Sequence, residues 1–186
     1  WALCGRRMSD DVTLTPISPF YRIRFDGGEV FDRHADRDAV RREVARLSPD
    51  DLDGFDRFMA ASEDIFRVGF EELGDVAFSS VTDMLRVLPE LIAKRGHRTV
   101  YGFISRFIRD PRLRTALSFH PLLIGGNPFT ATAVYCLIAF LEQRWGVHFA
   151  MGGTNRLVEG LCGLIRGQGG TVRLNTEVAE ILVAGG

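Results

Sequence analysis

Two short stretches combine residue types that could carry chemistry. Asp83 and Arg86 are three positions apart in an expected helix, so their side chains share one face and can pair. A surface ion pair of small energetic weight would give the same spacing. Gly152-Gly153-Thr154 places free backbone amides at an expected helix start, where amides can hold an anion or closely approach a ring system. A plain turn is the simpler explanation of a double glycine.

Other common chemical sites are absent from the sequence. The four histidines have no metal-ligand spacing, and the three cysteines include no CxxC pair, so neither a zinc site nor a disulfide framework is indicated. We predict no metal site and expect the cysteines to be buried thiols. The sequence also has no GxGxxG after a strand, no GxSxG and no HExxH. A pyrophosphate-binding turn is therefore not expected within this chain.

The densest set of turn residues lies in residues 119–153. His120-Pro121 and Asn127-Pro128 restrict the backbone, and Gly125-Gly126 lets it bend sharply between them. Thr130 to Phe140 then runs almost without a charge, which predicts an apolar helix. An ordinary buried helix between tight turns would account for this stretch. So many turn-forming residues around one helix also suit a functional role.

The elements before this stretch are predicted to be a hairpin and two helices. Residues 11–31 alternate in polarity around the turn Asp26-Gly27-Gly28, which predicts a β-hairpin. Helices are expected at 36–47 and from 48 to 70, where Ser48 can cap and Pro49 suits the first turn. The second helix carries an apolar stripe that we assign to the core, namely Leu52, Phe55, Phe58, Met59, Ser62, Ile65, Phe66 and Phe70.

A basic block follows these acidic helices. Residues 26–75 hold 15 acids and 7 bases, whereas residues 84–114 hold 8 Lys or Arg and 2 acids. Helical pieces are expected at 78–94 and 99–108, each with an apolar face and a basic face. This pattern is typical of a helix lying on anionic lipid, and equally of a buried helix with a solvated basic face. The block contains no recognised nucleic-acid-binding module, so nucleic acid is not an expected partner.

The last third predicts an α/β arrangement. A short helix is expected from Asp110-Pro111 to Leu117 and an amphipathic one at 154–166, followed by strands at 171–174 and 178–183. The longest apolar run, within 131–141, is too short to cross a bilayer. The hydrophobic content of 46% and the net charge of −1 are ordinary for a globular chain. Because both ends look abrupt, we expect an internal fragment of a longer enzyme.

Several of these motifs, in this order, resemble the bacterial-type phytoene desaturases, which are flavin-dependent carotenoid desaturases of the flavin amine oxidase superfamily. The resemblance covers nearly the whole chain. It lies in Pro19-Phe20-Tyr21, Ser118-Phe119-His120-Pro121-Leu122-Leu123, Gly125-Gly126-Asn127-Pro128-Phe129, Gly146-Val147-His148-Phe149, Gly152-Gly153-Thr154, Gly169-Gly170, Leu174-Asn175 and Val178.

The resemblance implies an α+β fold that is part of a two- to three-part flavoprotein. Residues 1–34 would be antiparallel strands of a substrate domain, and residues 35–117 an inserted helical block that could face a membrane. Residues 118–151 would return to the substrate domain, and residues 152–186 would begin the returning α/β domain that binds FAD. In this arrangement residues 120–129 shape the substrate cavity, and Gly152-Gly153 leads the chain toward the flavin.

The resemblance also implies a function and roles for single residues. The enzyme would use FAD to introduce C=C bonds into phytoene or a related carotene, and the fragment alone would be inactive. The implied catalytic residues are Asp83 and Arg86, the cofactor-binding residues Val178 (through its backbone), Gly152 and Gly153, and the substrate-binding residues His120, Asn127, Phe129 and Thr154.

The implied partners are a hydrophobic carotene and a membrane surface. The protein would be cytoplasmic and peripheral to the inner face of the cell membrane, and assembly as a homo-oligomer stays open. Two alternatives remain: another carotenoid oxidoreductase or isomerase acting on modified carotenes, and a non-catalytic, membrane-associated binder of apolar ligands. Upstream sequence separates the enzyme from the binder, because a strand followed by GxGxxG favours the enzyme.

Overall fold

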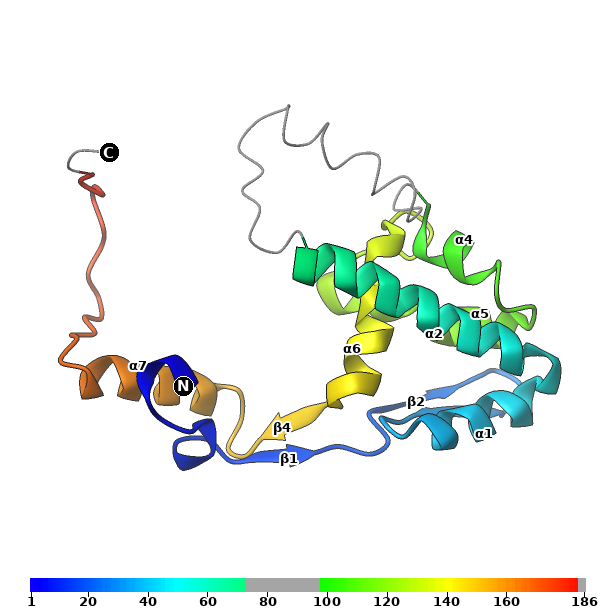
Figure 1. Cartoon of the computed structure of the whole chain (residues 1–186), viewed down its shortest axis with the longest axis horizontal. Coiled ribbons are helices and arrows are strands. Elements are labelled where there is room, and N and C mark those ends of the chain that lie inside the picture. Colours follow the sequence, from blue (N-terminus) through cyan, green and yellow to red (C-terminus); the bar gives the residue numbers. More distant parts are fainter. Residues whose placement is uncertain (73–97, 184–186) are drawn as a thin grey trace. The chain divides into compact units, whose positions relative to one another are not determined.

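The computed structural model describes residues 1–72 and 98–183, which form two compact units (Figure 1). The larger unit comprises residues 17–147, and the smaller one combines residues 1–16 with residues 148–186. Both helices and small antiparallel sheets are present, which confirms the expected α+β class. The domain boundaries expected after residues 34, 117 and 151 stay a prediction. No helix within the described residues is long and apolar enough to span a membrane.

The larger unit begins with a hairpin around the predicted turn, but the hairpin is shorter than the one expected at 11–31, because residues 14–16 pair with residues 148–150 instead. Strand β2 (Tyr21–Arg24) pairs antiparallel with β3 (Val30–Arg33), with Tyr21 opposite Arg33. Gly28, at φ 87°, makes the turn that a side chain would disfavour. Helix α1 (Arg37–Leu47) follows, and the side chain of Asp36 accepts a hydrogen bond from the Ala39 amide at its start.

Helix α2 (Leu52–Phe66) forms the centre of the core. Its predicted apolar stripe is confirmed at six positions that lie in or against the core cluster, namely Leu52, Phe55, Phe58, Met59, Ile65 and Phe66, and Ser62 is also buried. The expected cap by Ser48 is wrong, because that side chain makes no capping hydrogen bond at the start of the 3₁₀ helix Pro49–Asp51. The buried carboxylate of Asp51 instead accepts hydrogen bonds from the amides of Arg109 and Asp110, both at 2.8 Å.

The larger unit contains three further α-helices within the described residues, namely α4 (Val100–Ile104), α5 (Pro111–Leu117) and α6 (Leu137–Trp145). Of these, α6 packs on α2, which it crosses in Figure 1, and α4 packs on α5. The apolar helix expected from Thr130 starts later, as a 3₁₀ turn at Ala133–Cys136 that leads into α6. Residues 127–132 stay irregular because their backbone bonds to the start of α4, for example from the Val100 amide to the Ala131 carbonyl. The helix expected at 78–94 lies outside the described residues.

The smaller unit pairs β1 (Leu14–Pro16) with β4 (His148–Ala150) and continues into α7 (Asn155–Gly167). Helix α7 confirms the helix expected at 154–166. The prediction of strands at 171–174 and 178–183 is wrong, because these residues form no regular secondary structure. A strand needs a partner for its backbone groups, and the described residues provide none for this segment. Its apolar side chains are accordingly exposed.

Candidate functional site

The residues that follow the buried His120 form a largely exposed apolar loop on the larger unit. The 3₁₀ helix η5 (His120–Ile124) ends at Gly125, whose φ of 72° turns the chain. Leu122, Leu123 and Ile124 are 59%, 62% and 60% exposed, and Phe129 is 61% exposed. We call residues 121–129 the apolar loop. So many consecutive exposed apolar side chains are unusual for a surface that faces only water.

The far end of the apolar loop is fixed by local hydrogen bonds. The side-chain oxygen of Asn127 accepts a hydrogen bond from the Phe129 amide at 2.8 Å, so Asn127 shapes the turn. The Pro128 carbonyl accepts one from the Tyr101 amide at 3.1 Å, and the rings of Tyr101 and Phe129 lie 4.7 Å apart. Asn127 thus has a structural role in addition to the predicted substrate contact, which stays a prediction.

The near end of the loop is attached to a buried polar cluster. His120 is 1% exposed, and its Nε2 lies 3.1 Å from Oε2 of Glu142 on α6. The same carboxylate oxygen lies 3.5 Å from Nε of Arg33 on β3, which is fully buried, and Arg33 also donates from Nη2 to the Ala139 carbonyl at 2.9 Å. A carboxylate that accepts from both groups places the His120 proton on Nε2.

Tyr21 completes this polar cluster. Burial raises the pKa of its hydroxyl, the carboxylate of Glu142 raises it further, and Arg33 opposes both effects. The hydroxyl is therefore neutral at any physiological pH. Within the described residues, Tyr21 Oη, Arg33 Nη1 and His120 Nδ1 have no hydrogen-bond partner. The ring of Tyr21 packs 4.4 Å from that of Phe119, next to His120.

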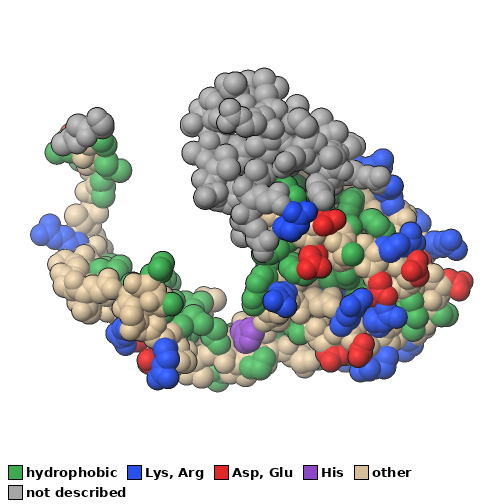
Figure 2. Space-filling view, in the orientation of Figure 1, with side chains coloured by type: hydrophobic (Ala, Val, Ile, Leu, Met, Phe, Trp, Pro, Cys, Tyr) green, Lys and Arg blue, Asp and Glu red, His purple; other side chains and the backbone are tan. Residues whose placement is uncertain are grey.

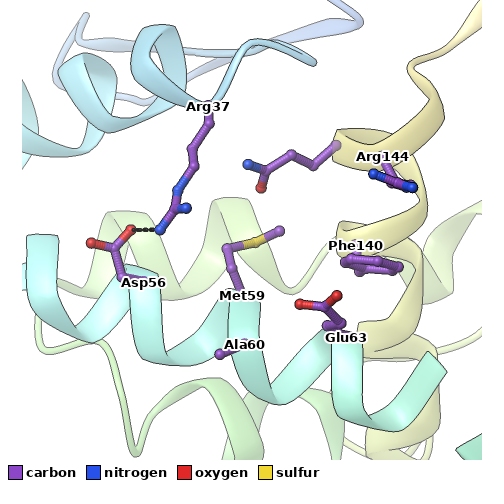
Figure 3. A pocket seen from close by; sticks show the side chains of 8 residues that line it. Arg37, Asp56, Met59, Ala60, Glu63, Phe140 and Arg144 are labelled. Atoms are coloured by element: carbon purple, nitrogen blue, oxygen red, sulfur yellow. Dashed lines mark hydrogen bonds and ion pairs between the residues drawn. The ribbon is translucent and has the colours of Figure 1, made fainter. Parts of the chain in front are cut away.

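A separate pocket of about 350 Å³ lies between α2 and α6 (Figure 3). Arg37 bonds Asp56 at one end, whereas Glu63, Phe140 and Arg144 lie at the other. Four of its eight lining residues carry a charge, so it suits a polar ligand and not a hydrocarbon. On the face shown in Figure 2, positive and negative side chains are interspersed over the larger unit.

In the smaller unit, Gly152 and Gly153 form the turn between β4 and α7. Their φ angles of 86° and 93° disfavour any other residue, and a Cβ on Gly153 would meet nothing within 4 Å. Thr154 follows as an exposed residue at the start of α7. The expectation of free amides is wrong for Gly153, whose amide donates to the Ala150 carbonyl at 2.8 Å, and the Arg156 side chain lies against Gly152.

Comparison with known proteins assigns the family. The model of the flavin containing amine oxidoreductase family matches residues 1–186. The chain belongs to this family. It is 45% identical to a lycopene-forming phytoene desaturase of Paracoccus sp. over 97% of its own length, and 45% identical to a neurosporene-forming one of Rhodobacter capsulatus over 99%. A lycopene-forming relative from Pseudescherichia vulneris is 44% identical over 99%.

The chain spans only about a third of each of these relatives, namely 36%, 35% and 37% of their lengths. Membership in a flavin-containing family confirms the expected cofactor class. Gly153 fits one part of a flavin site, since a Cβ there would meet nothing within 4 Å and the bare backbone allows the close approach of a ring system. Val178 is 73% exposed in an extended segment, and its predicted backbone contact to the cofactor stays a prediction.

The sequence did not indicate the buried polar residues that surround His120. Asp83 and Arg86 lie outside the described residues, and the structure brings His120, Asn127 and Phe129 onto one loop of the larger unit. Arg33 and Glu142 were not singled out, and Tyr21 was named only as part of the motif Pro19-Phe20-Tyr21. Arginine in a strand and glutamate in a helix ordinarily face solvent, so nothing in their local pattern indicated burial.

Proposed function

We propose that the full-length protein is an FAD-dependent carotenoid desaturase that introduces C=C bonds into phytoene or a related carotene. The observation that carries this proposal is 45% identity to phytoene desaturases over 97% to 99% of the chain. Identity at this level over the hairpin, the helical unit and the glycine turn makes a different reaction class hard to accommodate.

In this reaction two hydrogens leave neighbouring carbons, one as a hydride and one as a proton, and a C=C bond forms between the carbons. FAD, when bound, supplies the acceptor for the hydride. The chain itself would bind and align the hydrocarbon, which has no polar handle and is therefore recognised by apolar burial. The exposed side chains of Leu122, Leu123, Ile124 and Phe129 supply such a surface.

Asp83 and Arg86 are proposed to serve the proton step, as the resemblance implies. Gly152 and Gly153 are proposed to admit the cofactor, and Thr154 to lie near the substrate. The charged pocket between α2 and α6 is assigned no role in substrate binding, because a hydrocarbon gains nothing from arginine and glutamate side chains.

We further infer that the protein is peripheral to the inner face of the cell membrane, where a carotene substrate dissolves. The apolar loop and the exposed arginines at both ends of α4, Arg98, Arg106 and Arg109, support this proposal. A basic and an apolar surface on one unit suit a surface of anionic lipid.

The activity is tested with purified full-length protein, added FAD and phytoene in lipid vesicles, and the products are separated by chromatography. We expect carotenes with longer conjugation, and the number of double bonds distinguishes lycopene from neurosporene formation. An Arg144→Gln variant in the charged pocket should give the same product yield. A protein that retains bound flavin but leaves phytoene unchanged would contradict the proposal.

A further inference from the structure

We propose that Arg33, Glu142 and His120 form a positioning triad that holds the start of the apolar loop in place. The proposal rests on the proposed function insofar as the loop is assigned to the carotene. None of the three side chains needs to touch the substrate, since each is at least nine-tenths buried. Their role is to fix the backbone from which Leu122, Leu123 and Ile124 project.

The triad connects three elements that are distant in sequence. Arg33 comes from β3, His120 from η5 and Glu142 from α6. One oxygen of Glu142 lies within 3.1 Å of His120 Nε2 and 3.5 Å of Arg33 Nε, and Arg33 also bonds the Ala139 carbonyl. Two donors on a single acceptor, with one of them attached twice to the same helix, define the position of the imidazole ring.

The two ends of the loop are held in different ways. At the far end, backbone amides and carbonyls of residues 98–101 and 128–133 bond one another, and among side-chain changes only proline would remove a donor. At the near end, the polar side-chain attachment is His120 to Glu142. Replacing the triad should therefore loosen η5 and leave the Asn127 turn in place.

Stability alone does not account for this triad. Burying charged groups is costly, and replacing a buried ion pair by apolar residues of similar size is often neutral or stabilising. Arg33 Nη1 and His120 Nδ1 additionally lack hydrogen-bond partners within the described residues. A costly polar cluster placed directly beneath an exposed apolar loop points to positioning.

The test compares full-length wild-type protein with the triple variant Arg33→Met, Glu142→Leu and His120→Phe. This variant avoids leaving a lone buried charge, which would unfold a single variant such as Glu142→Gln. The matched control is Arg22→Met with Asp32→Asn, which removes an exposed ion pair of the same hairpin. Hydrogen exchange is measured at the amides of Leu122, Gly125 and Gly126, which bond carbonyls within residues 119–122.

We expect exchange at these three amides to become about tenfold faster in the triple variant, while amides of α2 and the whole control variant stay unchanged. Unchanged exchange at these amides, or an equal increase throughout α2, would overturn the positioning role. In the phytoene assay we expect KM to rise about tenfold with kcat unchanged. Faster loop exchange with an unchanged KM would uphold the positioning role and refute the assignment of the loop to the substrate.

Discussion

Asp110 shows how one carboxylate can join three elements of the larger unit. It caps α5 by accepting hydrogen bonds from the amides of Arg112 and Leu113 at 2.8 and 3.2 Å. Its other oxygen pairs at 2.7 Å with the Arg112 guanidinium, which reaches Glu29 in the hairpin turn and the carbonyl of Leu47 at the end of α1. The hydrogen bond from Arg112 lowers the pKa of Asp110, with the backbone bonds acting in the same direction.

We predict that Asp110→Asn removes an acid-sensitive part of the stability. Because the pKa of Asp110 is lower in the folded than in the unfolded protein, its contribution is present at neutral pH and is lost as the pH falls below about 4. The difference in urea midpoint between wild type and variant should therefore shrink between pH 5 and pH 2. A difference that stays constant with pH, or an equal effect of Asp53→Asn at an exposed ion pair of α2, would contradict this prediction.

Sequence identified some residues of the candidate site and missed their partners. His120, Gly152 and Gly153 stood out because proline and glycine mark restricted or unusual backbone. Arg33 and Glu142 lie 109 residues apart in the chain, and no local pattern reports a contact over that distance. The expectation of three buried thiols held only for Cys136, where burial raises the pKa to about 12, whereas Cys4 and Cys162 are partly exposed.

At the level of elements, α2 shows both what periodicity predicts and where it fails. The apolar stripe predicted the helix and its buried face, because spacing of 3.6 residues is a local property. Gly54 lies in this helix without any sequence reason, since glycine destabilises helix interiors. The structure supplies the reason: a Cβ on Gly54 would lie 2.0 Å from the Phe107 carbonyl oxygen, just after α4.

We predict that Gly54→Ala destabilises the protein by about 1–3 kcal/mol, because the added methyl group forces α2 and the segment after α4 apart. The measurement is the free energy of unfolding by chemical denaturation. Gly163→Ala in α7 is the matched control, since its Cβ would meet nothing within 4 Å and alanine favours a helix. Destabilisation by Gly163→Ala equal to that by Gly54→Ala would contradict the packing explanation.

The strands that were wrongly predicted at 171–174 and 178–183 show what local propensity cannot predict. They are rich in β-forming residues, yet side chains such as Ile181 and Leu182 are about four-fifths exposed. A helix satisfies its backbone groups within itself, whereas a strand depends on a neighbour that may be distant in the chain. Propensity can therefore predict α7 and the hairpin, each made from adjacent residues, but not a strand whose partner lies elsewhere.

At the scale of the whole molecule, the uneven distribution of charge matters more than the net charge of −1. The acidic residues concentrate at 26–75 and the basic ones at 84–114. The described part of the basic segment includes α4, which adjoins the apolar loop through the Tyr101–Pro128 hydrogen bond. Because the basic surface lies beside an apolar one, the side of the larger unit that carries both would turn toward anionic lipid.

We predict that the full-length protein binds vesicles containing phosphatidylglycerol and that Arg98→Gln, Arg106→Gln and Arg109→Gln together weaken this binding. Each basic residue near an anionic surface contributes about 1 kcal/mol, so the triple variant should lose about 100-fold in affinity in a sedimentation assay. The control, Arg22→Gln, Arg37→Gln and Arg57→Gln, removes the same charge from exposed ion pairs. Equal losses in both triple variants would show that only total charge matters, and equal wild-type binding to neutral vesicles would exclude the electrostatic attachment.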